Sequence, residues 1–90
     1  MTYEELKQLA PGTLVRVKGG VYDYMFLQGA SPFDYMIRVE MNGVNQTVDP
    51  SQVSSLTVYD TAMIKRMYEA VFADKDTRFN QVVEFIEKLK

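Results

Sequence analysis

An Asn-Gly pair between two alternating runs of apolar and polar residues constrains the fold of this 90-residue chain more than any other feature. Residues 35–41 precede Asn42 and Gly43, and residues 44–48 follow them. Asn-Gly between such runs is the strongest short-range signal of a β-hairpin, because both residues of its two-residue turn must adopt positive φ. The sequence therefore predicts an antiparallel hairpin over residues 35–48.

A two-residue turn also fixes the register of the hairpin. We expect three opposed pairs on one face: Met41 with Val44, Val39 with Gln46, and Ile37 with Val48. That face is apolar apart from Gln46, and the opposite face carries Arg38 and Glu40. A slip by one residue would bury both charges, so the register should be firm.

The β pattern extends on both sides of this hairpin, over residues 11–59. Residues 13–18 alternate as a half-buried strand does, and Gly19-Gly20 predicts a tight turn into a second strand over residues 21–28. A loop over residues 29–34 then leads to the hairpin. Pro50 predicts a short turn after the hairpin, because it cannot donate to a strand ladder, and a last strand over residues 53–58.

Helical patterns flank the strands. Thr2 and Glu5 fit a capping box for a short helix over residues 3–9. After residue 59 the apolar period becomes 3.6, which predicts two helices with a polar break at residues 74–76. Their expected inner faces are Ile64, Met67, Tyr68, Val71 and Phe72 in the first, and Phe79, Val82, Val83, Ile86 and Leu89 in the second.

Two segments carry a resemblance to a known architecture. Residues 11–20 (PGTLVRVKGG) resemble the opening of SH3-like small barrels, including the KOW type, and residues 48–53 resemble the turn before their last strand. The resemblance implies a partly open five-stranded barrel. With the flanking helices, and a length that suits one domain, the sequence predicts an α+β fold in a single domain, 1–90. Its parts would be an N-terminal helix in 1–10, a small antiparallel five-stranded SH3-like barrel in 11–59 and a C-terminal helical hairpin in 60–90. The layout is also similar to that of small phage and mobile-element proteins.

Composition argues against catalysis. The chain has no Cys and no His, so the usual nucleophile–base pairs and zinc sites cannot form. Asp74, Asp76 and Asn80 could approach a calcium ion, but the closing Glu of an EF-hand is absent, and helix capping by Asp76 or Thr77 is the alternative. We therefore expect no catalytic residue, no metal and no cofactor.

Aromatic residues are the candidates for partner binding. Alternation places Tyr22, Tyr24 and Phe26 on one side of their strand. Either the helical hairpin covers this side, or it is an exposed stripe, extended by Phe33 or Tyr35, that binds peptides or stacks bases. Phe33 could anchor a partner from the loop, or it could fold back to plug the open end of the barrel.

Three cations, Arg16, Lys18 and Arg38, could form a basic patch for nucleic acid. Nearby acidic residues offset them, and the net charge is −2, so a solvated face is the alternative.

The expected function is that of a protein-interaction module, an adaptor or inhibitor that docks on a larger partner; the phage resemblance implies a host enzyme as that partner. One alternative is a nucleic-acid-binding KOW-like module. Another is a structural homo-oligomer, a homodimer through the last helix with Phe79, Phe85 and Leu89. No stretch approaches the roughly 20 apolar residues of a membrane span, and no basic-then-apolar leader opens the chain, so we expect a cytoplasmic protein.

Overall fold

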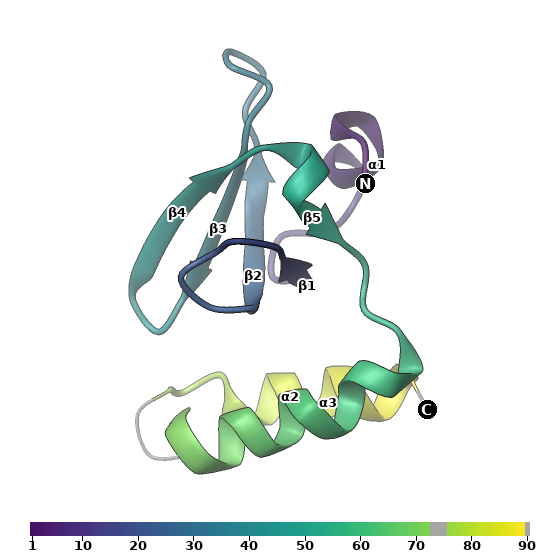
Figure 1. Cartoon of the computed structure of the whole chain (residues 1–90), viewed down its shortest axis with the longest axis vertical. Helices are drawn as coiled ribbons and strands as arrows, with labels where there is room; N and C mark the ends of the chain where they lie inside the picture. The colour runs from purple at the N-terminus through teal and green to yellow at the C-terminus, as the bar shows by residue number, and fades with distance from the viewer. Residues whose placement is uncertain (73–75, 90) are drawn as a thin grey trace. The chain divides into compact units, whose positions relative to one another are not determined.

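The computed structural model describes residues 1–72 and 76–89 (Figure 1). Its internal contacts divide the chain into two compact units, Met1–Ser55 and Leu56–Lys90. The first unit holds the strands and one helix, and the second holds the remaining α-helices. The chain is thus mixed helix and strand, as expected, while a single domain over 1–90 stays a prediction.

The first unit begins with helix α1, Tyr3–Lys7, and its predicted capping box is confirmed. The Glu5 N–H donates to Thr2 Oγ1 at 3.2 Å, and the Thr2 N–H donates to Glu5 Oε1 at 3.0 Å. Leu6 is the buried residue of this short helix, which contacts β2 of the sheet. The helix ends at Lys7, two residues before the predicted end.

Five strands form one antiparallel sheet in the order β4-β3-β2-β1-β5. Their bounds are β1 Leu14–Val17, β2 Tyr24–Ala30, β3 Ile37–Met41, β4 Val44–Val48 and β5 Val53–Ser54. A one-turn 3-10 helix, η1 (Pro50–Gln52), connects β4 to β5. The sheet is open, with β4 and β5 as its two edges, so the five-stranded antiparallel arrangement is confirmed, while its assignment as an SH3-like barrel stays a prediction.

The β3–β4 hairpin has the predicted register at every pair from Met41↔Val44 to Ile37↔Val48. Asn42 and Gly43 have φ values of 51° and 81°, as the two-residue turn requires. The side chains of Ile37, Val39 and Met41 are fully buried, so this face of β3 belongs to the core.

The predicted tight turn at Gly19-Gly20 is wrong, since β2 begins at Tyr24 and residues 18–23 form a wide β1–β2 loop. Gly20 serves a close approach instead: a Cβ there would lie 2.9 Å from Val17 Cγ1. The Val21 N–H donates to Gln46 Oε1 at 2.9 Å, so the one polar side chain on the apolar hairpin face binds this loop.

The second unit contains a 3-10 turn, η2 (Val58–Asp60), helix α2 (Thr61–Met67), a π-helical segment, η3 (Tyr68–Phe72), and helix α3 (Phe79–Leu89). The predicted last strand is therefore too long: β5 ends at Ser54, and the Asp60 carboxylate accepts bonds from Thr57 N and Oγ1 at 3.0 and 2.8 Å, which closes a turn there.

Helix faces in this unit follow the prediction in part. Ile64, Tyr68 and Phe72 are buried at intervals of four residues, whereas Val71 is 52% exposed. The π-helical bonds over Tyr68–Phe72 widen the turn, so the buried stripe departs from the 3.6-residue period. Val82 and Ile86 are the buried residues of α3. Two residues of the predicted polar break, 74 and 75, lie outside the described residues.

Among the helices of the described residues, none has the length and apolar character that a membrane crossing would require.

Candidate functional site

The β2–β3 loop (residues 31–36) presents the most exposed aromatic side chain of the described chain. Phe33 is 93% exposed, and Tyr35 is 64% exposed. The alternative in which Phe33 plugs an open end of the sheet is therefore wrong. Aromatic side chains are enriched at protein interfaces, so an exposed ring on this loop is a candidate anchor for a partner.

Hydrogen bonds within the loop fix the backbone that carries the Phe33 ring. The Ser31 N–H donates to the Met36 carbonyl at 2.9 Å, and the Tyr35 N–H donates to the Ser31 carbonyl at 3.1 Å. The Phe33 N–H donates to Ser31 Oγ at 3.3 Å, and the Met36 N–H donates to Asp34 Oδ1 at 3.0 Å. The loop is thus ordered before any partner arrives, which lowers the entropic cost of binding.

Tyr35 adopts a left-handed conformation, with φ of 56°, which is uncommon for a bulky residue. Its ring makes an edge-to-face contact with Tyr3, the first residue of helix α1, with the ring centroids 5.2 Å apart. Such strained positions persist where surrounding contacts compensate for them, and they cluster at binding loops. The contact with Tyr3 ties the exposed loop to the rest of the unit.

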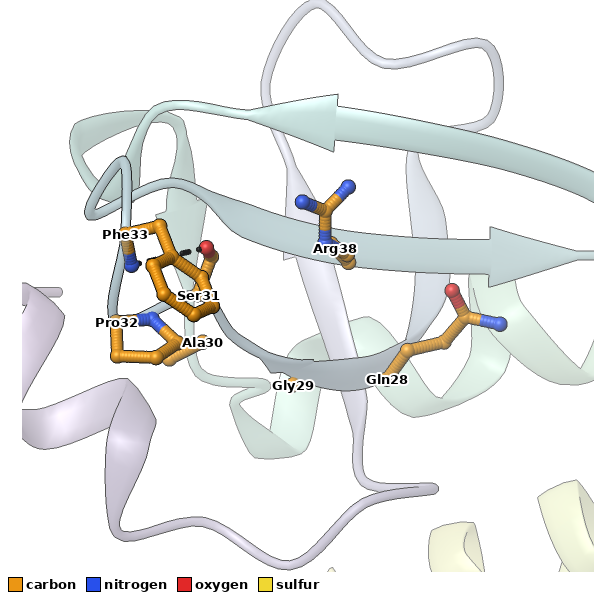
Figure 2. Close-up of a pocket in the computed structure, with 7 residues that line it drawn as sticks. All are labelled: Gln28, Gly29, Ala30, Ser31, Pro32, Phe33 and Arg38. Atoms are coloured by element: carbon orange, nitrogen blue, oxygen red, sulfur yellow. Dashed lines mark hydrogen bonds between the residues drawn. The ribbon is translucent and has the colours of Figure 1, made fainter.

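A shallow pocket of about 320 Å³ lies beside Phe33. Figure 2 shows the side chains around it, with Pro32 and Phe33 on the loop and Arg38 on β3. The complete lining is Gln28, Gly29, Ala30, Ser31, Pro32, Phe33 and Arg38. At Gly29, next to a register shift in the β2–β3 ladder, an added Cβ would meet nothing within 4 Å. The pocket therefore has room for a side chain beside Gly29.

The charges around the loop are loosely paired. Arg38 Nη2 lies 3.8 Å from Asp34 Oδ2, and both side chains are about half exposed. Arg38 Nη1 also donates to Thr47 Oγ1 at 3.4 Å. The Met36 N–H, then the Ser31 hydroxyl and then Arg38 lower the pKa of Asp34. An exposed pair of this length is weak, so a carboxylate on a partner can compete with Asp34 for the guanidinium.

The predicted exposed stripe on β2 is wrong for two of its three residues. Tyr24 and Phe26 are only 3% and 5% exposed, and Tyr22 is partly exposed in the β1–β2 loop. Their neighbours Met25 and Leu27 are buried on the opposite side, so β2 is covered on both faces. The physical reason is that a strand that is apolar on both sides must bury both. Of the five predicted aromatic residues, Phe33 and Tyr35 share one loop.

The three predicted cations are not brought together. Arg16 and Lys18 line a second pocket of about 430 Å³ with Asp23, and Arg38 belongs to the pocket beside Phe33. In the sheet, Arg16 pairs with Tyr24 and Arg38 pairs with Gly29. Five residues of strand separate those two positions on β2, or roughly 16 Å. Nucleic-acid binding stays a prediction, with a dispersed set of cations.

The acidic residues considered for calcium do not form a site within the described chain. The Asp76 carboxylate accepts hydrogen bonds from Arg78 N at 2.8 Å, Nε at 3.1 Å and Nη2 at 3.1 Å, and Asp74 lies outside the described residues. Over residues 1–72 and 76–89, no group of three or more acidic side chains could hold a metal ion. The Asp76–Arg78 pair belongs to the structure of the second unit.

Sequence reasoning placed Gly29 in the candidate loop, although the structure places it in β2, and it missed the pairing of Asp34 with Arg38. The spacing of four residues between Asp34 and Arg38 was a weak signal, because it crosses from a loop into a strand. The open approach at Gly29 depends on the register shift between Leu27 and Gly29, which a period-2 pattern does not reveal.

Comparison of the chain with protein-family models, with curated proteins and with solved structures found no match. The β2–β3 loop and its pocket are therefore the features of this chain that bear on its function.

Proposed function

We propose that this protein is a non-enzymatic protein-interaction module, an adaptor or inhibitor, that docks on a larger protein through the β2–β3 loop with Phe33 as its anchor. The observation that carries the proposal is the nearly complete exposure of Phe33 on a loop fixed by its own hydrogen bonds. Aromatic anchors that enter a partner's pocket supply a large share of binding energy at protein interfaces.

The surroundings of Phe33 fit a protein partner better than a small ligand. The adjoining pocket is shallow and open, whereas small-molecule sites enclose most of their ligand. Arg38, at its margin, can pair with a carboxylate of the partner, and arginine is enriched at protein interfaces. These features suit a convex loop that enters a groove of the partner: the exposed Phe33 ring, the shallow apolar pocket and the cation Arg38 at the pocket's margin.

The SH3-like resemblance supports the same proposal. The resemblance implies a partly open five-stranded barrel with a short turn before its last strand, and an open five-stranded sheet with η1 before β5 is compatible with it. In such barrels the loop at the position of residues 29–34 often carries the binding residues. Because one fold hosts many functions, the site and not the fold carries the argument.

The experiment is affinity capture from a lysate of the source cell, with the partner then purified for titration. Phe33→Ala should weaken binding by about 30-fold or more, the loss of a hot-spot residue worth ~2 kcal/mol. Tyr59→Ala is the matched control, because Tyr59 is an aromatic residue that is 85% exposed in the other unit. Both variants should keep the wild-type melting temperature.

A second variant tests the pocket. Gly29→Leu places a side chain where a Cβ meets no atom within 4 Å, so the fold tolerates it while the hollow is filled. The proposal expects Gly29→Leu to block the same partner that Phe33→Ala loses. Equal binding by Phe33→Ala and Tyr59→Ala would refute it.

A further inference from the structure

Strand β4 is a free edge of the sheet, because its described partner is β3 alone. In a hairpin with a two-residue turn, the two residues that flank the turn form a hydrogen-bonded pair: the N–H of each donates to the carbonyl of the other. Along the hairpin, every second pair is bonded in this way, and the residues between them direct their N–H and carbonyl groups away from the partner strand. Val44, Gln46 and Val48 therefore direct their backbone groups toward β3. Asn45 and Thr47, both exposed, direct theirs outward, away from the sheet.

This edge lacks the features that usually protect exposed strands from pairing. Residues 44–48 (VNQTV) contain no charge and no Pro, and their register with β3 runs without a bulge. The opposite edge differs: β5 has two residues, and the Val53 carbonyl accepts a hydrogen bond from the Met1 amine at 2.6 Å. Figure 1 shows β4 at the edge of the sheet in the N-terminal unit.

We propose that β4 pairs antiparallel with β4 of a second copy of this chain, about a two-fold axis at Gln46. Asn45 of one copy then lies opposite Thr47 of the other, and each such pair exchanges two backbone hydrogen bonds. The same strand serves on both sides, as a two-fold interface requires.

Two observations favour a second copy over an unrelated extended segment. The strand is uncharged, so two copies approach without repulsion between like charges on β4. The register also places the half-buried Val44 of one copy opposite Val48 of the other, which extends the apolar face of the sheet across the axis. The edge thus complements itself in both its backbone groups and its apolar side chains.

The size of this contact sets the strength of the dimer. A pair of five-residue strands covers less than the roughly 1,200 Å² of a stable interface. The dissociation constant should therefore be on the order of 100 µM, in the range of transient pairs.

Sedimentation velocity tests the proposal. The wild-type sedimentation coefficient should rise as the protein concentration is raised from about 10 µM to about 1 mM, because the fraction of dimer increases with concentration. Thr47→Pro should stay monomeric throughout, because proline removes an outward N–H that β3 does not use. Thr47→Val keeps that N–H and is the control, and it should dimerise as the wild type does.

A second variant guards against misfolding of the proline variant. Asn45→Lys keeps every backbone group and adds a charge to the edge, and it should also stay monomeric. A wild-type protein that is monomeric at about 1 mM overturns the proposal. Self-association that persists in both Thr47→Pro and Asn45→Lys also overturns it and would point to pairing through α3. Assembly beyond a dimer overturns it as well and would point to pairing of β4 with β5.

Discussion

Asp76 provides the sharpest stability prediction, because its carboxylate organises the start of α3. Its side chain is 3% exposed, and it binds both the backbone and the guanidinium of Arg78. Tyr68 Oη lies 3.5 Å from Asp76 Oδ2. Asp76→Ala removes the acceptor and leaves Arg78 without this charge partner.

The cost follows from these contacts. Breaking one side of a buried ion pair costs about 3–5 kcal/mol. The Arg78 side chain is 29% exposed and regains water when Asp76 is removed, so we expect about 2–3 kcal/mol. For a chain of this size that loss lowers the melting temperature by roughly 10–20 °C. Asp76→Asn keeps an acceptor for the Arg78 N–H and should lose about half as much.

The pH dependence has a definite sign. Burial raises the pKa of Asp76, but hydrogen bonds and charge from Arg78 outweigh it and hold the pKa below its ordinary value of 3.8. The folded state therefore binds this proton less readily than the unfolded state. The stabilisation is complete at neutral pH and is lost as the pH falls below about 5 and through the lowered pKa.

Urea unfolding followed by circular dichroism at 222 nm measures both effects, since α2 and α3 dominate the helical signal. Glu84→Gln, an exposed change on α3, is the control. The difference between wild type and Asp76→Asn should shrink as the pH is lowered from 7 toward 3. A loss below about 0.5 kcal/mol for Asp76→Ala at neutral pH would refute the reasoning, because surface substitutions fall in that range.

Two further predictions concern the first unit. Gly43→Ala should lower the free energy of unfolding by about 1 kcal/mol, because Gly43 has a φ of 81° and free space around it, so only backbone strain opposes the new methyl group. A thermal melting curve measures this loss, and an unchanged midpoint would contradict it. Labelled DNA and RNA should show no salt-sensitive binding in a fluorescence anisotropy assay, since the cations Arg16 and Arg38 lie apart. Binding whose affinity falls by orders of magnitude between about 50 and about 200 mM salt would favour the nucleic-acid alternative instead.

Local signals in the sequence predicted the parts of the fold that depend on local chemistry. Asn42-Gly43 set the turn and register of the β3–β4 hairpin, and Thr2 with Glu5 set the start of α1. Both depend on residues within a few positions of one another. The pattern failed at Gly19-Gly20, where a hydrogen bond from Val21 to Gln46, 25 residues away, holds a wide loop open.

The sequence was enough to name Phe33 as a candidate binding residue, but it did not predict the geometry of the site around it. Composition identified Phe33 and Tyr24 as aromatic candidates alike, and only tertiary packing separates them, at 93% and 3% exposure. The pocket lies beside the register shift at Gly29, and the left-handed Tyr35 contacts Tyr3 of α1. These features arise between segments distant in sequence, which periodicity does not report.

Photo-crosslinking at Phe33 tests the central claim most directly. A benzoylphenylalanine at position 33 keeps the exposed aromatic ring in place, and the same group at the exposed position 59 is the control. The proposed function predicts that position 33 crosslinks to a discrete protein partner in the source cell and that position 59 does not. A chain that crosslinks to the same proteins from both positions, or to none from position 33, would contradict it.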